Sequence, residues 1–245
     1  MRLAFAFVLI AVLASIACGN VIARKYEYEE EVFLALDGSA TVYINASLPA
    51  LVALRGLKLP VDPRARLDRQ VVRDLYESPV SRVASVTASR REGRRYVHLR
   101  LTVPDVRRLN EAPPFAWSAY LYRQQEGQFE YSQVMRGPAL QTSAPSVAVG
   151  DVGWDGNELI AVRLHLPSKV TFHNSPSRTI ERGNIIVWEE TLTDRQKGVP
   201  LEIMARMETQ SILFRTLALF GAMGVLVVLT FIAAIWFVRS RQPSV

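Results

Sequence analysis

Cysteine and histidine are almost absent from this chain of 245 residues, which has one cysteine, Cys18, and three histidines. A single thiol excludes both a framework of intramolecular disulfides and a metal site built from several thiolates. His98, His165 and His173 form no i, i+4 helical pair and no cluster with cysteine. We therefore expect no metal site and no cofactor.

Catalytic sequence motifs are also missing. The chain contains no Gly-x-Ser-x-Gly motif, no phosphate-binding loop and no glycine-rich nucleotide fingerprint. The acidic stretch at residues 151–158 resembles the start of a calcium loop, but Gly153 and Val162 stand at positions 3 and 12, where the loop needs oxygen ligands, so we expect a turn there. We predict no catalytic residues and a protein that is not an enzyme. An enzyme whose catalytic residues come from distant parts of the sequence is the alternative.

Lysine is scarce, so arginine carries most of the positive charge. The formal net charge of +6 includes Arg2, Arg215, Arg239 and Arg241, which lie in or beside apolar segments. Without these four residues, basic and acidic side chains are almost equal in number, which argues against binding to bulk polyanions. We expect no nucleic acid partner.

Two long apolar runs flank the polar part of the chain. The first, residues 3–17, follows one basic residue and ends in small residues before Cys18, as in a secretory signal peptide. The second, residues 217–238, would reach about 33 Å as a helix, which is enough to cross a hydrocarbon core of about 30 Å. Arg239 and Arg241 follow it without an acid, as expected of a cytoplasmic tail.

These runs predict a single-pass protein of the cell membrane. Its predicted parts are a signal peptide at residues 1–18, a domain outside the cytoplasm at 19–209, a membrane-anchoring helix at 210–238 and a cytoplasmic tail at 239–245. Cys18 is the predicted lipidation site, and its lipid would hold both ends of the domain near one leaflet. Ordinary cleavage of the signal, which Ser15-Ile16-Ala17 also fits, is the alternative.

Alternating apolar and polar residues predict strands through most of the domain. In the first strand Tyr28 and Val32 are assigned to the core face, and Glu27 and Glu29 to the polar face. Residues 137–156, rich in small residues and proline, are expected to form a loop or hinge. Hairpins are expected at 26–36 with 40–45, 80–89 with 95–103, and 115–123 with 128–136, and further strands at 158–166, 169–173, 184–191 and 201–207.

Two helices are expected between these strands. Ser47 can cap a short one. Leu67, Val71 and Leu75 form an apolar stripe that predicts an amphipathic helix over residues 64–77. The predicted fold class is α+β, with a mainly antiparallel sheet of hairpins, one or two packed helices and a single C-terminal transmembrane helix.

Residues 162–170 read VRLHLPSKV and are followed by Asn174, the pair Gly183-Asn184 and Trp188. An alternating strand that ends in Pro, a small residue, Lys and Val, followed by Asn and a Trp-bearing strand, resembles the LppM-like bacterial lipoproteins. The order of export signal, hairpins and C-terminal membrane helix is similar to that family as well. The resemblance implies a membrane-anchored, non-enzymatic envelope domain that contacts lipid or glycolipid. It carries over no residue with a chemical role.

Four arginines gather at the tip of the second predicted hairpin: Arg90, Arg91, Arg94 and Arg95. A basic residue near an anionic membrane surface contributes about 1 kcal/mol. These residues are therefore candidate contacts to lipid head groups. A solvated hairpin tip is the alternative.

The first functional hypothesis is a membrane-anchored binding module outside the cytoplasm, with the bilayer, a lipid or glycolipid and an envelope protein as partners. The alternative is a non-catalytic structural or assembly subunit of an envelope membrane complex. An apolar pocket of several hundred Å³ would favour the first hypothesis. A compact domain with a flat apolar patch would favour the second.

Overall fold

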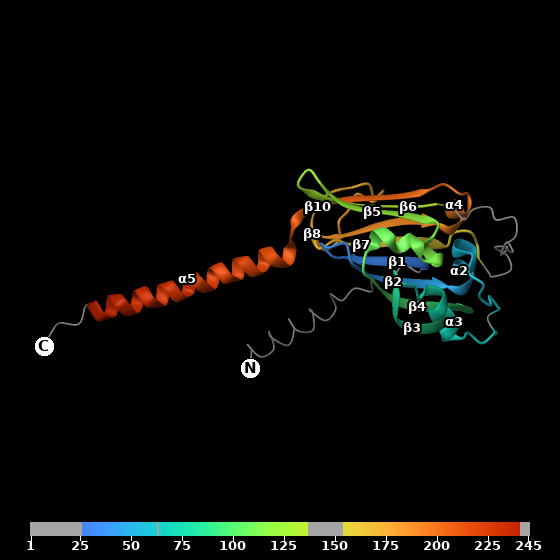
Figure 1. Cartoon of the computed structure of the whole chain (residues 1–245), viewed down its shortest axis with the longest axis horizontal. Helices are drawn as coiled ribbons and strands as arrows, with labels where there is room; N and C mark the ends of the chain where they lie inside the picture. The colour runs from blue at the N-terminus through green and yellow to red at the C-terminus, as the bar shows by residue number, and fades with distance from the viewer. Residues whose placement is uncertain (1–25, 63, 137–153, 241–245) are drawn as a thin grey trace, which may run out of the picture.

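A computed structural model describes residues 26–62, 64–136 and 154–240 of the chain. Two β-sheets pack against each other to form the domain, and one long helix leaves it at one end (Figure 1). The pairing between strands is mostly antiparallel, and short helices pack beside the sheets. The predicted α+β class is confirmed, although the strands form two sheets where one was expected.

The strands divide between a six-stranded and a four-stranded sheet. In spatial order, the six-stranded sheet contains β3 (Arg82–Arg91), β4 (Arg94–Val103), β2 (Ala40–Ser47), β1 (Tyr26–Leu34), β7 (Leu159–His165) and β9 (Ile185–Thr191). The four-stranded sheet contains β5 (Ser118–Gln125), β6 (Gln128–Met135), β10 (Leu201–Ser211) and β8 (Ser168–His173). The helices are α2 (Leu48–Arg55), α3 (Arg69–Tyr76), α4 (Leu192–Gln196) and α5 (Ile212–Ser240), with 3-10 helices η1 (Val106–Glu111) and η2 (Pro113–Phe115).

The three predicted hairpins are confirmed as β1 with β2, β3 with β4, and β5 with β6. Side-chain alternation sets their register, since a shift by one residue would turn every apolar side chain to the wrong face. The pairing of β1 with β7 is parallel and places Val32 opposite Leu164. The strand pattern did not predict this pair, because alternation within one strand does not specify a partner far away in the chain.

In β1 the predicted core face is confirmed, but one glutamate that was assigned to the polar face is buried. Tyr28 and Val32 are buried as predicted, but Glu27, assigned to the polar face, is only 3% exposed. The Tyr96 hydroxyl donates a hydrogen bond to this carboxylate, and the Trp154 indole N–H donates to it at 3.2 Å. Aromatic side chains therefore cover Glu27 on a face that the sequence assigned to solvent.

The second predicted helix is shorter than residues 64–77. α3 begins at Arg69 because the Asp68 carboxylate accepts a hydrogen bond from the backbone N–H of Gln70 and caps the helix there. The expected apolar stripe is also displaced by one position, since Val71 is 46% exposed whereas Val72 is fully buried. The short helix capped by Ser47 is confirmed as α2.

A buried ion pair lies between the two sheets. Glu30 of β1 accepts a hydrogen bond from Arg55, the last residue of α2, with 2.7 Å between Oε2 and Nη2. Gln133 of β6 donates from Nε2 to the other oxygen of Glu30 at 2.8 Å, so one carboxylate contacts both sheets. The guanidinium also lies 3.5 Å from the centre of the Trp117 ring. Removing one partner of a buried pair costs about 3–5 kcal/mol, so this network disfavours other packings of the sheets.

Buried tyrosines extend this network. The Tyr28 hydroxyl donates to Glu30, and the Tyr131 hydroxyl donates to Gln133, both at 2.8 Å. Burial raises the pKa of Tyr28 and of Tyr131 well above the ordinary value, so both remain protonated donors at neutral pH. Tyr76 is also buried, but its hydroxyl has no hydrogen-bond partner among the described residues.

α5 follows β10 without a linker, since the strand ends at Ser211 and the helix begins at Ile212. The segment Ile212–Phe237 is long and apolar enough to cross a membrane, by its length and composition. The last strand was expected to end at Met207. It is longer because Glu208 still pairs with Gln128 of β6, and Ser211 pairs with β8.

The signal peptide, Cys18, residues 137–153 of the expected hinge and the tail after residue 240 lie outside the described residues. Lipidation of Cys18 therefore stays a prediction. Tyr26, the first described residue, begins β1 and pairs with Leu159, which begins β7, so both strands start at the same end of the sheet.

We predict that Tyr28→Phe lowers the free energy of unfolding by about 1–3 kcal/mol, because it removes a hydrogen bond to a buried carboxylate. Tyr76→Phe is the matched control. It removes a buried hydroxyl without a partner among the described residues, and should leave the stability unchanged or raise it. Urea denaturation of the full chain in detergent measures both variants, and a greater loss in Tyr76→Phe than in Tyr28→Phe would contradict the network.

Candidate anion-binding site

A hollow of about 610 Å³ lies between the segment that leads into α3 and the ends of β3 and β4 next to their turn. We call it the arginine hollow. Arginines predominate in its lining, and the described residues that line it include no acid. These residues are Arg64, Arg66, Leu67, Arg69, Ala88, Ser89, Arg90 and Arg95.

Local structure on both sides of the hollow follows from the sequence. The β3–β4 turn is made by Glu92 and Gly93, both with positive φ, which brings Arg90 opposite Arg95. On the other side, the Asp62 carboxylate accepts a hydrogen bond from the backbone N–H of Arg64 at 2.8 Å and fixes a turn. The two arginine-bearing segments are far apart in sequence and meet only because α3 packs on β3.

The four arginines predicted as head-group contacts separate into two pairs. Arg90 lies opposite Arg95, and Arg91 lies opposite Arg94, in the register of the hairpin. Neighbouring side chains on a strand point to opposite faces. Arg90 and Arg95 accordingly line the arginine hollow, whereas the other two do not.

Arg91 and Arg94 bind the protein itself. Arg91 donates to the backbone carbonyl of Tyr26 at 2.9 Å, and Arg94 forms an ion pair with the buried Glu27 at 3.1 Å. The guanidinium of Arg91 also lies 4.2 Å from the centre of the Tyr96 ring. These contacts hold the hairpin against β1. A contact between these arginines and lipid head groups stays a prediction.

Sequence reasoning missed three arginines of the hollow, Arg64, Arg66 and Arg69. All three lie in the stretch 64–77 that was expected to be a helix, and Arg66 and Arg69 fall off its apolar stripe. Their signal was the arginine-rich stretch itself, but its partner segment could not be identified without the packing of α3 on β3.

The arginine hollow is suited to oxyanions. A guanidinium keeps its charge at all physiological pH values and presents a planar fork that matches a phosphate or carboxylate in a bidentate geometry. The volume of about 610 Å³ falls within the range of small-molecule sites, about 300–1,000 Å³. Its lining is polar, so it is not the apolar pocket that was considered for a lipid ligand.

The arginine hollow and α5 lie at opposite ends of the domain. Arg95 lies near the start of β4, next to the β3–β4 turn. Val103 is the last residue of β4, and it lies at the same end of the sheet as His165, the last residue of β7. Two residues after His165, the carbonyl of Pro167 accepts a hydrogen bond from the N–H of Ile212, the first residue of α5. We call the end near Ile212 the anchor end, and the end with the hollow the distal end.

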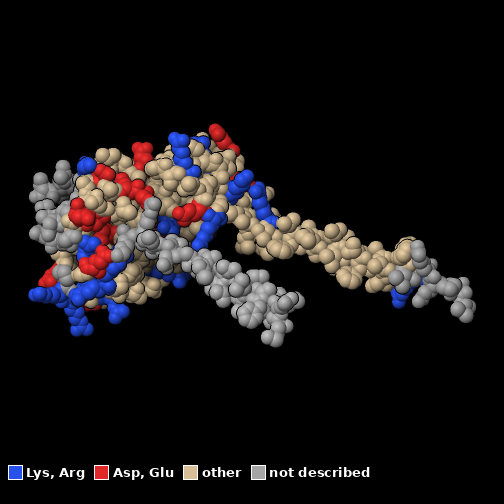
Figure 2. Space-filling model, turned by 180° about the vertical axis from the view of Figure 1, so that it is seen from behind, with Lys and Arg blue, Asp and Glu red and all other residues tan. Residues whose placement is uncertain are grey.

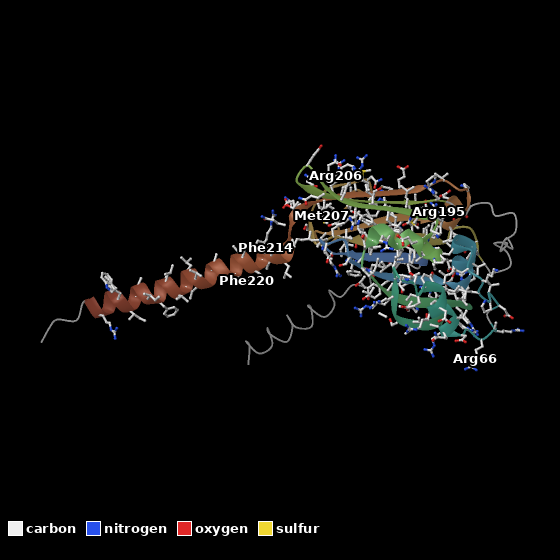
Figure 3. The ribbon with its side chains drawn as sticks, in the orientation of Figure 1. Arg66, Arg195, Arg206, Met207, Phe214 and Phe220 are labelled. Atoms are coloured by element: carbon white, nitrogen blue, oxygen red, sulfur yellow. The ribbon has the colours of Figure 1, made fainter. Side chains whose placement is uncertain are left out.

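The views of the molecule agree with this placement. Figure 3 shows Arg66 at the distal end and Phe214 at the start of α5. In Figure 2, basic side chains lie at the corner of the domain away from α5, and others lie beside the start of α5.

The three histidines lie apart from the hollow or only beside it. His98 contacts Ser89 at 2.8 Å, and His165 contacts Glu31 at 2.6 Å. The hydrogen bond with His165 lowers the pKa of Glu31. Within the described ranges, no group of three or more His, Cys, Asp or Glu residues is arranged to hold a metal ion.

No family model matches the chain, and no curated protein matches it. Among solved structures, it is similar to the folded domain of LppM from Mycobacterium tuberculosis, determined by NMR. The two share 15% identity at a TM-score of 0.39, over 77% of this chain and 94% of that domain.

We predict that Arg94→Gln lowers the free energy of unfolding by about 1–3 kcal/mol, because it leaves the buried carboxylate of Glu27 without its ionic partner. Arg66→Gln, in the exposed lining of the hollow, should change it by less than about 0.5 kcal/mol. Urea denaturation of the full chain compares the two variants. Equal losses would show that Arg94 does not support the hairpin as described.

Proposed function

We propose that the chain is a non-catalytic binding module, anchored in a membrane by α5, that holds an anionic ligand in the arginine hollow outside the cytoplasm. The observation that carries the proposal is the hollow itself, which has a volume of about 610 Å³. Arginines of α3 and of the segment before it line one side, and arginines of β3 and β4 line the other. Several guanidinium groups around one hollow create a positive potential that attracts an anion.

The chemistry of the hollow narrows the ligand. Several guanidinium groups favour a ligand with more than one phosphate or similar oxyanion, since each group can bind one oxyanion through two hydrogen bonds. Of a lipid or glycolipid, the phosphate-bearing head group fits this polar lining, and the acyl chains do not. A free polyphosphate has the same chemistry.

We predict that inositol hexakisphosphate, used as a probe, binds the full chain in phosphatidylcholine nanodiscs. Each hydrogen-bonded arginine contributes about 1.4 kcal/mol, so Arg66→Gln with Arg69→Gln should weaken binding about 100-fold. Raising the salt concentration should weaken binding as well, because exposed charges are screened. Isothermal titration calorimetry measures the affinities.

The matched control is Arg107→Gln with Arg108→Gln, which removes the same charge. These exposed arginines pair with Asp105 and Glu111, each at 2.8 Å, and do not line the hollow. Their loss should leave the affinity within about twofold, since only the long-range field changes. Equal weakening by both double variants, or no binding by the unaltered chain, would overturn the proposal in favour of the structural-subunit alternative.

We also propose that Cys18 is lipidated and becomes the N-terminus of the exported protein. The expectation that this lipid holds both ends of the domain near one leaflet is wrong, because Tyr26 begins β1 at the distal end and α5 leaves from the anchor end. The residues between Cys18 and Tyr26 would have to run extended along the domain for the lipid to reach the bilayer that holds α5. Mass spectrometry of the membrane-purified chain should find a diacylglyceryl group on Cys18. An unmodified N-terminus at or after Cys18 would contradict lipidation and leave α5 as the anchor.

A further inference from the structure

The ends of β4 set the distance between the arginine hollow and the membrane helix. Arg95, in the lining, and Val103, at the anchor end, are eight residues apart in the same strand. At about 3.3 Å per residue, the hollow lies about 26 Å beyond the level at which β4 ends. The head groups of the bilayer that holds α5 lie on the far side of that level.

The junction between the domain and α5 holds this arrangement. The backbone N–H of Ile212 donates to the carbonyl of Pro167 at 3.0 Å, and the N–H of Phe214 donates to the Ser211 hydroxyl at 3.0 Å. One turn into the helix, Arg215 forms an ion pair with Glu208 of β10. With no linker and these contacts across the junction, the domain cannot fold over onto the bilayer without breaking them.

Electrostatic attraction does not bridge this gap. The Debye length at physiological ionic strength is about 8 Å, so a separation of about 26 Å exceeds three screening lengths. Head-group phosphates of the anchoring bilayer therefore neither reach the hollow nor attract it.

Basic residues near the anchor end lie beside acids. Arg107 and Arg108, which follow the anchor end of β4, pair with Asp105 and Glu111. At the junction, Lys169 lies 3.8 Å from Glu208. Acids therefore accompany these basic groups near the anchor end.

We infer that the arginine hollow binds a phosphate-bearing ligand presented in trans, from solution or from a surface facing the anchoring membrane. Head groups of the bilayer that holds α5 are not its ligand. This inference rests on the proposed function and adds the direction from which the ligand arrives.

The test uses the full chain in nanodiscs of phosphatidylcholine alone or mixed with phosphatidylglycerol. In one arm, immobilised discs are offered separate vesicles that contain phosphatidylglycerol. In the other arm, the affinity for inositol hexakisphosphate is measured in both kinds of disc. Arg66→Gln with Arg69→Gln and the control Arg107→Gln with Arg108→Gln are carried through both arms.

Phosphatidylglycerol within the disc should change the affinity for the soluble probe by less than about twofold, since it lies beyond the screening length. Capture of the separate vesicles, lost in the hollow variant and kept in the control, supports a facing surface as the source of the ligand. Probe binding without vesicle capture supports a ligand from solution.

Competition by phosphatidylglycerol in the same disc would lower the affinity for inositol hexakisphosphate by about tenfold or more. This result would show that the hollow binds its own bilayer, which would overturn the inference and leave the proposed function intact. If neither the probe nor the vesicles bind in any arm, both the inference and the proposed function are overturned.

Discussion

The carboxylate of Glu30 is the point on which the two sheets depend. It accepts hydrogen bonds from Arg55 and Tyr28 on its own side of the domain and from Gln133 on the opposite sheet. Each of these groups is buried, so each would lose about 1–3 kcal/mol or more if left without its partner. A packing that displaces one sheet relative to the other would break the contact between Glu30 and Gln133 and leave both buried groups short of a hydrogen bond, whereas purely apolar side chains would tolerate several packings.

This network also connects the arginine hollow with α5. The arginine hollow is built on β3 and β4 of the six-stranded sheet, whereas α5 continues from β10 of the four-stranded sheet. The position of the hollow relative to α5 is therefore set by how the sheets face each other. Arg195 of α4 adds a second link, since it donates to the carbonyl of Met135 in β6 at 2.6 Å.

Hairpins were predictable from sequence because alternation and turn residues are local, as in β3 and β4 around Glu92 and Gly93. The cap of α2 at Ser47 is local too. The parallel pairing of β1 with β7, the burial of Glu27 and the link from Glu30 to Gln133 were not predictable, because each joins residues more than a hundred positions apart. The hollow was found only in part because its two segments, residues 64–69 and 88–95, meet through the packing of α3 on β3 and not through a local pattern. Arg90 and Arg95 belonged to a visible cluster, whereas Arg64, Arg66 and Arg69 join them through tertiary packing.

The central claim is that the domain stands on α5 with the arginine hollow facing away from the anchoring bilayer. Energy transfer from a donor dye to acceptor dyes on the lipid head groups tests it most directly. The dye is attached at Ser89→Cys, in the hollow, or at Lys169→Cys, at the anchor end, in the exported protein, in which a lipid on the Cys18 sulfur leaves the introduced cysteine as the one free thiol. The account predicts strong transfer from position 169 and much weaker transfer from position 89. Equal transfer from both positions would mean that the domain lies flat on the membrane, which would contradict the account.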